Sequence, residues 1–232
     1  MIQVDHASKL FPGKNGQPVT ALRDISLDVE QGEFVMIVGP SGSGKSTLLF
    51  TIGGMQHPTK GRVLFADCDV YGLSSTKRAS LRRMRIGFVF QTLNLVPYLS
   101  CVDNVVVPAV LAGKARRTSL RRAKDLLERL GLSHRLKHRP SELSVGERQR
   151  VALCRSLINN PDVILADEPT GNLDETMTGE VMDVLRSLNG EGQTIMMATH
   201  NPLLAGQGTR LVTLRDGSIV LDERCPREEA LV

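Results

Sequence analysis

The sequence contains no tryptophan, and phenylalanine and tyrosine together supply only 3% of its residues. Proteins that hold single-stranded nucleic acid combine basic grooves with aromatic stacking surfaces, and such surfaces are scarce here. Cysteine is also scarce, because Cys68, Cys101, Cys154 and Cys225 lie far apart and form no C-x-x-C pair. This spacing predicts reduced thiols rather than disulfides or zinc ligands.

Long hydrophobic runs are missing as well. No apolar run approaches the roughly 18 residues that a membrane-spanning helix needs. Residues 1–5 lead directly into a strand-like segment, so we expect no secretory signal and a cytoplasmic protein. The 232 residues, of which 41% are hydrophobic and 23% charged, are enough for one large α/β domain or two small ones with a real core.

The net charge of +4 is concentrated in two clusters. The first consists of Lys77, Arg78, Arg82, Arg83 and Arg85, and the second of Arg116, Arg117, Arg121, Arg122 and Lys124. Such clusters are typical of solvated helix faces, and they also suit anionic lipid headgroups, nucleic acid or an acidic partner. The scarcity of aromatic residues disfavours nucleic acid, and the other three alternatives stay open.

A phosphate-loop motif provides the most specific signal. Residues 39–47 fit the pattern G-x-x-x-x-G-K-[ST] and read Gly39, Pro40, Ser41, Gly42, Ser43, Gly44, Lys45, Ser46 and Thr47. The glycines let backbone N–H groups approach phosphate oxygens, Lys45 reaches the β and γ phosphates, and the Ser46 hydroxyl suits Mg²⁺. A buried-strand run at residues 34–38 precedes the loop and a helix starting at Ser46 follows it. We therefore predict a site for a nucleoside triphosphate.

Two adjacent acids follow a second buried-strand run, at residues 163–166. In open α/β sheets ligands bind beyond the carboxyl ends of the strands, which is where Asp167 and Glu168 stand. Successive side chains of a strand point in opposite directions, so the two acids can serve different purposes. We assign Asp167 to Mg²⁺ and Glu168 to polarising the attacking water.

Ser144 and Glu147 form a capping box at the start of a predicted helix that ends at residues 159–161. A helix N-terminus that offers a serine hydroxyl and the Gly146 amide is an anion site. Taken alone, a capping box also marks an ordinary helix start. With the phosphate loop, the chain offers two helix ends that suit phosphate.

The remaining pattern predicts an α/β nucleotide-binding core with a helical insert. Further strands are expected at residues 61–66, 86–90 and 194–198, with a closing hairpin at 211–214 and 218–221. The stretch from about 92 to 158 has mostly helical periodicity. Within it, Thr118 is the candidate N-cap and Gly131 the stop of one helix.

In this order the motifs resemble those of the ATP-binding cassette (ABC) ATPases, over essentially the whole chain. Residues 39–47 resemble the Walker A loop, 143–147 the signature sequence, and 163–168 Walker B with the catalytic glutamate. The resemblance further implies that Gln91 is the Q-loop glutamine near Mg²⁺ and water, Asp174 the D-loop aspartate, His200 the switch histidine, and Phe11 an aromatic that stacks on adenine.

The resemblance implies a fold and an organisation of the chain. The fold would be a P-loop NTPase domain of the ABC type, with an antiparallel β subdomain and a helical subdomain insert. Residues 1–232 would form one domain, with the core and β subdomain at about 1–91 and 159–232 and the helical subdomain at about 92–158.

The signature departs from the family pattern at two positions. Val145 replaces the first glycine and Glu147 the final glutamine, whereas Gly146 is retained. As the first residue of a capped helix, Val145 has a negative φ, so no glycine is required there. We expect an active site in which the Val145 side chain crowds the nucleotide and slows turnover.

The resemblance also implies partners. In the family, two cassettes form a head-to-tail dimer and hold ATP between the Walker A loop of one and the signature residues of the other, here Ser144, Val145, Gly146 and Glu147. The catalytic residues would be Glu168, His200 and Gln91, and the Mg²⁺ ligands Ser46, Gln91 and Asp167. A homodimer with a separate membrane-spanning chain would work at the cytoplasmic face of the inner or plasma membrane.

Within the family, residues 139–144, 146–150 and 166–174 resemble the branch of the lipoprotein-releasing, macrolide-exporting and cell-division ATPases. A transporter ATPase is the leading interpretation, and a regulatory ATPase of the cell-division type is the alternative. A nucleic-acid-linked ABC ATPase is disfavoured, because the chain has neither a long coiled-coil insertion nor a second cassette.

Overall fold

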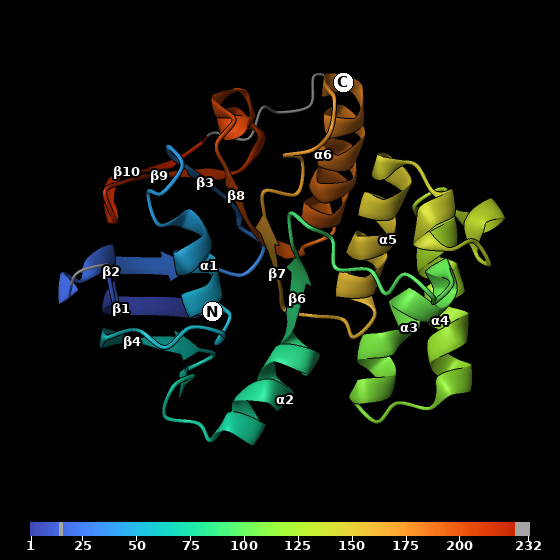
Figure 1. Cartoon of the computed structure of the whole chain (residues 1–232), viewed down its shortest axis with the longest axis horizontal. Coiled ribbons are helices and arrows are strands. Elements are labelled where there is room, and N and C mark those ends of the chain that lie inside the picture. Colours follow the sequence, from blue (N-terminus) through green and yellow to red (C-terminus); the bar gives the residue numbers. More distant parts are fainter. Residues whose placement is uncertain (14–15, 226–232) are drawn as a thin grey trace.

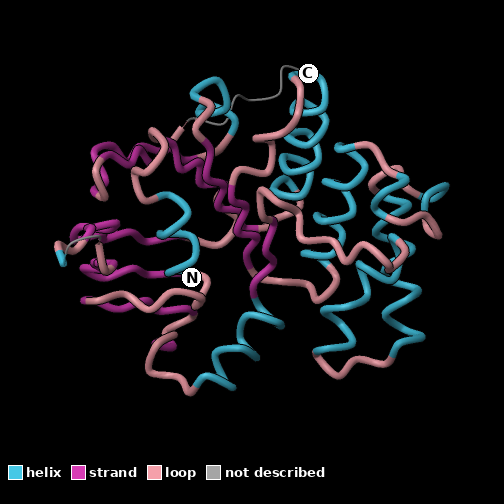
Figure 2. The backbone as a smooth tube through the Cα atoms, in the orientation of Figure 1, coloured by secondary structure: helices cyan, strands magenta, loops and turns pink. Residues whose placement is uncertain are grey.

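The computed structural model describes residues 1–13 and 16–225 (Figures 1 and 2). Its strands are β1 (Ile2–Phe11), β2 (Val19–Val29), β3 (Phe34–Val38), β4 (Lys60–Phe65), β5 (Cys68–Asp69), β6 (Ile86–Val89), β7 (Val163–Asp167), β8 (Thr194–Thr199), β9 (Arg210–Arg215) and β10 (Ser218–Arg224). Its α-helices are α1 (Lys45–Ile52), α2 (Ser75–Arg85), α3 (Cys101–Leu111), α4 (Arg116–Arg129), α5 (Val145–Leu157) and α6 (Glu175–Gly190). Short 3₁₀ helices span Ser133–Arg135, Pro140–Glu142 and Pro202–Gln207.

A six-stranded sheet in the order β10-β9-β3-β8-β7-β6 forms the centre of the molecule. Strands β9, β3, β8, β7 and β6 are parallel, and β10 closes the edge as the antiparallel partner of β9. Strands β3, β7 and β8 are almost entirely buried because both faces of the sheet are covered there. Phe34 and Met36 belong to the core on the side of α3–α6, and Val35 and Ile37 to the core on the side of α1.

A second, four-stranded sheet in the order β2-β1-β4-β5 packs into the core on the α1 side. All its pairings are antiparallel, as expected for the predicted β subdomain. The hairpin β9–β10 and the strands at β3, β4, β6, β7 and β8 confirm the strand predictions within one to three residues at their ends.

The helical insert consists of α3, α4 and α5, which lie side by side at the right of Figure 1. The prediction that Thr118 caps α4 is wrong, because the helix begins at Arg116 and its N-cap is Ala115. The leucine pattern starts only at Leu120, but the exposed polar residues Arg116, Arg117 and Thr118 extend the helix in a way that apolar periodicity does not detect. The end of α4 is as predicted, since Gly131 follows it with a φ of +73°.

Helices α2 and α6 had no explicit prediction from the sequence. Helix α2 begins at the Ser74 cap and has no buried residue, so it lacks the apolar periodicity that reveals most helices. None of the helices in the described ranges is both long enough and apolar enough to cross a membrane.

Candidate nucleotide-binding and catalytic site

The phosphate loop connects β3 to α1 at the carboxyl edge of the central sheet. Gly39 and Gly44 have φ values of +152° and +105°. A Cβ atom would lie 2.2 Å from the carbonyl oxygen of Leu214 at Gly39, and 2.4 Å from that of Ala21 at Gly44. Both positions therefore require glycine for space as well as for backbone conformation. The loop backbone is packed against β2 and β9, which fixes where its N–H groups point.

No side chain caps the N-terminus of α1, whose N-cap residue is Gly44. The first N–H groups of a helix have no partner within the helix and favour negative charge. Beside them the Ser43 hydroxyl is buried without a hydrogen-bond partner among the described residues. This end of α1 thus has the donors that a phosphate group needs.

Lys45 extends back over the phosphate loop. Its ammonium group donates to the carbonyl oxygens of Gly39 at 2.8 Å and Pro40 at 3.1 Å, and it lies 3.9 Å from Oε1 of Glu168. The side chain is only 7% exposed. A nearly buried cation is therefore held at the point where the sequence places the β and γ phosphates.

Ser46 and Asp167 are in direct contact, although they are distant in sequence. The Ser46 hydroxyl donates to Oδ1 of Asp167 at 2.8 Å. Burial raises the pKa of Asp167, the Ser46 hydrogen bond opposes that rise, and the neighbouring Glu168 charge adds to it. The neighbouring carboxylates of Asp167 and Glu168 therefore favour binding of a cation at this partly buried site.

Glu168 lies between two basic side chains. Its Oε2 is 2.9 Å from Nδ1 of His200, and its Oε1 faces Lys45. Its φ is +49°, an uncommon value for a residue with a side chain, and backbone strain of this kind concentrates at functional sites. Hydrogen bonds from Glu168 N–H to the Ala198 carbonyl and from Gly171 N–H to the Glu168 carbonyl hold this conformation.

Gln91 follows β6, the neighbour of β7 in the sheet. The position that a Cβ of Gly171 would take lies 3.3 Å from Nε2 of Gln91, so the amide lies beside the segment that follows Glu168. The structure thus places Gln91 at the same edge as Asp167 and Glu168, with its amide beside Gly171 and no hydrogen bond to Asp167 in the described part of the chain.

The signature residues form the N-terminus of α5. The Ser144 hydroxyl accepts from the Glu147 N–H, and the Glu147 carboxylate accepts from the Ser144 N–H at 2.8 Å, so the predicted capping box is confirmed. Val145 is the first helical residue and has no positive φ, as expected. Helices α1 and α5 lie on opposite sides of the central sheet (Figure 1), so the signature residues do not join the phosphate loop within one chain.

Two other predicted site residues have local roles in the structure. Oδ1 of Asp174 accepts from the N–H of Met177 at 2.8 Å and caps α6. Phe11 ends β1, with the Lys9 ammonium 5.1 Å from its ring centroid. Strand β1 pairs with β2, whose Ala21 carbonyl lies against Gly44.

Two arginines that position site segments had no prediction from the sequence. Arg155 of α5 donates to the carbonyl oxygens of Leu93 and Asn94, the residues just after Gln91, both of which have positive φ. Arg135 donates to Oε1 of Glu147 at 2.8 Å. The N–H of Ser144 and this guanidinium lower the pKa of Glu147. For Arg155, only its apolar surroundings on α5 could have indicated an inward-facing arginine.

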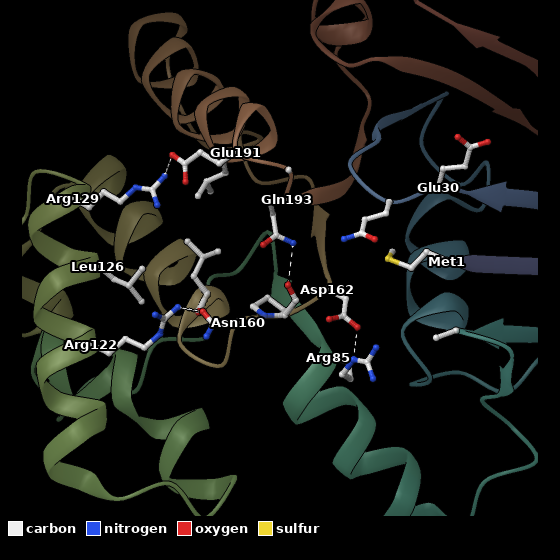
Figure 3. Close-up of a pocket in the computed structure, with 16 residues that line it drawn as sticks. Met1, Glu30, Arg85, Arg122, Leu126, Arg129, Asn160, Asp162, Glu191 and Gln193 are labelled. Carbon is white, nitrogen blue, oxygen red and sulfur yellow. Dashed lines mark hydrogen bonds and ion pairs between the residues drawn. The ribbon is translucent and has the colours of Figure 1, made fainter.

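A pocket of about 780 Å³ opens at the opposite edge of the sheet, at the amino ends of β7 and β8 (Figure 3). Its arginines are already engaged, since Arg129 pairs with Glu191, Arg85 with Asp162, and Arg122 bonds Asn160. This pocket is remote from the phosphate loop and from Glu168, and it contributes nothing to the nucleotide site.

The chain matches a known protein family. The family model described as "ABC transporter" matches residues 22–171. The chain belongs to the ABC transporter family. It is an ATP-binding cassette with the fold expected from the sequence, and an ATPase of the ABC type.

Similar proteins come from several bacteria. An uncharacterized ABC transporter ATP-binding protein of Thermotoga maritima is 48% identical over 206 residues, which cover 89% of this chain and 88% of that protein. The lipoprotein-releasing system ATP-binding protein LolD of Syntrophus aciditrophicus is 46% identical, with 95% of this chain and 99% of LolD covered.

Longer proteins also contain a similar cassette. The macrolide export ATP-binding/permease protein MacB of Chromobacterium violaceum is 44% identical over 99% of this chain, which spans only 35% of MacB. Among solved structures, the cassette MJ0796 in a dimeric post-hydrolysis state bound to ADP and Pi matches with a TM-score of 0.88 and 36% identity. The match covers 97% of this chain and 98% of that one.

Proposed function

We propose that this chain is the ATPase subunit of a membrane transporter, that it works as a homodimer with a separate membrane-spanning chain at the cytoplasmic face of the membrane, and that it uses Mg²⁺. The observation that carries the proposal is the separation of the phosphate loop from the signature helix within one chain. Each chain supplies two half-sites and no complete one, so two chains related by a twofold axis would complete both sites.

The phosphate loop would hold the β and γ phosphates of ATP. The uncapped N–H groups of α1 favour anions, and Lys45 lies among them with its side chain almost fully buried. On ATP binding the Lys45 ammonium would exchange the carbonyl oxygens of Gly39 and Pro40 for phosphate oxygens. Charged partners give shorter and stronger hydrogen bonds than neutral ones, which favours this exchange.

Ser46, Asp167 and Gln91 would hold Mg²⁺. Their hydroxyl, carboxylate and amide oxygens are the hard donors that Mg²⁺ prefers, and the contact between Ser46 and Asp167 supports the first two ligands. The bound ion would offset the charge of the phosphates. The raised pKa of Asp167 fits a carboxylate whose anion gains from a nearby cation.

Glu168 would polarise the water that attacks the γ phosphate. Its carboxylate is only 12% exposed, and contacts to Lys45 and His200 fix both of its oxygens. His200 would orient Glu168 and reach toward the γ phosphate, while Gln91 beside Gly171 would contact the same water. Glu168 would thus be a general base whose neighbours hold it in position before the reaction begins.

The signature helix would complete the site of the second chain. Gly146 N–H and the exposed Ser144 hydroxyl would face the γ phosphate bound by the partner, and Asp174 would lie at the same interface. Loss of the γ phosphate would remove the group that bridges the two chains, and the dimer would open. The dimeric state of MJ0796 supports this arrangement.

The names of the similar proteins support a subclass. LolD is named for lipoprotein release and MacB for macrolide export, and both are similar to this chain over nearly its whole length. We therefore place the chain in the branch that exports compounds, extracts lipoproteins or couples ATP hydrolysis to mechanical work through a membrane partner.

The first experiment is the Glu168→Gln variant, which keeps the shape of the side chain and removes its basicity. We expect ATP binding to persist and steady-state turnover to fall by about 10²–10⁴-fold, the usual contribution of a general base. Gel filtration with ATP and Mg²⁺ would then detect a trapped dimer. Glu175→Gln, an exposed acid at the start of α6, is the matched control and should retain wild-type turnover. Wild-type turnover in Glu168→Gln would contradict the catalytic assignment.

The trapped dimer also tests the partner. Affinity purification of Glu168→Gln from detergent-solubilised host membranes should recover a polytopic membrane protein. The identity of that protein would distinguish an exporter from a regulatory complex of the cell-division type. Recovery of nucleic acid or ribosomes without a membrane protein would contradict the transporter proposal.

A further inference from the structure

The first basic cluster contacts the segment that leads into the second. Nη1 of Arg83 on α2 donates to the carbonyl oxygen of Leu111 at the end of α3, at 2.9 Å. The following turn leads directly into α4, so α2 and the α3–α4 turn together form the lower edge in Figure 1. We call this surface the basic edge and define it by Arg83, Met84, Val110, Leu111, Lys114 and Arg117.

The positive charge of the basic edge is not neutralised. Arg83 donates to a neutral carbonyl, and Lys114 and Arg117 form no ion pair within the described part of the chain. Helix α2 contains no acidic residue at all. The neighbouring arginines differ, since Arg85 pairs with Asp162 and Arg116 with Asp103. The edge therefore has uncompensated positive charge, which attracts anions.

Large apolar side chains stand among these cations. Met84 is 37% exposed, Val110 46% and Leu111 61%. Single exposed apolar residues are normal, but Met84 follows Arg83 and Val110 precedes Leu111, so all three belong to the segments that the Arg83–Leu111 hydrogen bond joins. A basic surface with protruding apolar side chains suits a lipid interface, where cations meet headgroups and apolar groups enter the acyl boundary.

We propose that the basic edge binds the surface of membranes that contain anionic lipids, with Arg83, Lys114 and Arg117 at the phosphate headgroups and Leu111 entering the headgroup boundary. The cassette would then contact lipid by itself, independently of a membrane-spanning chain. This goes beyond the proposed function and depends on it only for the presence of a membrane nearby. Nucleic acid fits less well, because the edge has no aromatic side chain for stacking.

Vesicle co-sedimentation tests the electrostatic part. The purified wild-type chain should bind vesicles of phosphatidylcholine with phosphatidylglycerol and not vesicles of phosphatidylcholine alone. Binding should vanish as the salt concentration rises from about 0.01 M to about 1 M, because the screening length falls from about 30 Å to about 3 Å. Lys114→Ala/Arg117→Ala should weaken binding about 25-fold, at about fivefold per basic residue.

The matched control carries the same change in net charge elsewhere. Arg23 and Lys60 are exposed on the antiparallel β subdomain, and Arg23→Ala/Lys60→Ala should bind vesicles like the wild type. Equal losses in both double variants would mean that net charge alone attracts the protein, and this would overturn the proposal. Absence of any vesicle binding by the wild type would also overturn it and would favour an acidic protein partner.

Because the sequence contains no tryptophan, a tryptophan introduced at position 111 can report whether this position enters the lipid interface. Leu111→Trp introduces a single indole, whose emission should shift to the blue on anionic vesicles and be quenched by lipids with brominated chains. Val220 on β10 is 57% exposed, and Val220→Trp should show neither effect. Identical spectra for the two variants on vesicles would contradict entry of Leu111 into the lipid interface.

ATP turnover of the purified chain without vesicles distinguishes lipid binding from the proposed ATPase function. Lys114→Ala/Arg117→Ala should hydrolyse ATP at the wild-type rate in the absence of vesicles, because none of these residues belongs to the nucleotide site. Glu168→Gln should bind vesicles normally. A failure of vesicle binding therefore leaves the ATPase proposal intact, and a failure of the catalytic assignment leaves lipid binding intact.

Discussion

The two helix ends proposed to bind phosphate are built in opposite ways. The N-terminus of α1 has no side-chain cap and depends on glycines held against neighbouring carbonyl oxygens. The N-terminus of α5 has a complete capping box, and Arg135 supports its glutamate. At α1 no side chain bonds the first N–H groups, which leaves them for a ligand. At α5 the capping box already bonds some of these groups. The difference suggests that the phosphate loop binds ATP first and that the signature helix, stable by itself, is presented to ATP already bound by a partner.

Glycine-to-alanine changes should give the largest difference between the two helix ends, in both ATP binding and stability. Gly44→Ala requires a side chain at a φ of +105° and brings Cβ to 2.4 Å from a backbone oxygen. We expect it to abolish ATP binding and to lower the free energy of unfolding by roughly 3 kcal/mol. Isothermal titration calorimetry and urea denaturation would measure the two effects.

Gly146→Ala is the matched change at the other end. Its Cβ would lie 3.6 Å from Sδ of Met177, an ordinary contact, and alanine favours the helix by up to about 1 kcal/mol. The single chain should therefore bind ATP with unchanged affinity and unfold no more easily. Loss of ATP binding in this variant, or its retention in Gly44→Ala, would contradict the division of labour between the two ends.

The elements that could be predicted from the sequence are those that local patterns determine. The phosphate loop between a strand and a helix, the two acids at the carboxyl end of β7 and the capping box at Ser144 were all predicted, because spacing and turn chemistry are local properties. Helix α2 was missed because none of its residues is buried. The contacts of Arg155 with Leu93 and Asn94 join segments about 60 positions apart, since the pairs are separated by 62 and 61 residues, and no local pattern indicates them.

The capping box at α5 should have a moderate, measurable effect. Ser144→Ala removes the acceptor for the Glu147 N–H and should lower the free energy of unfolding by about 1 kcal/mol. In a chain of this size the melting temperature should fall by about 2–4 °C. Ser144→Thr keeps a hydroxyl cap and should restore most of the loss. If Ser144→Ala melted like the wild type, the signature end would not be self-stabilised.

The carboxylates beside the two ends should respond to pH with opposite signs, which is the smallest effect expected. The pKa of Glu147 is lowered, so its contribution to stability is present at neutral pH and is lost as the pH falls below about 5 toward the lowered pKa. The pKa of Asp167 is raised by burial, so the folded state gains from its protonation and loses that gain as the pH rises through the raised pKa. At pH 7 in the absence of nucleotide, Glu147→Gln should therefore destabilise the chain and Asp167→Asn should stabilise it. Urea denaturation of both variants between pH 4 and pH 7 would measure the two differences, and each should shrink as the pH falls. If both variants changed the free energy of unfolding in the same direction, the charge of Asp167 at the phosphate-loop end would be compensated without nucleotide, as the charge of Glu147 is at the signature end.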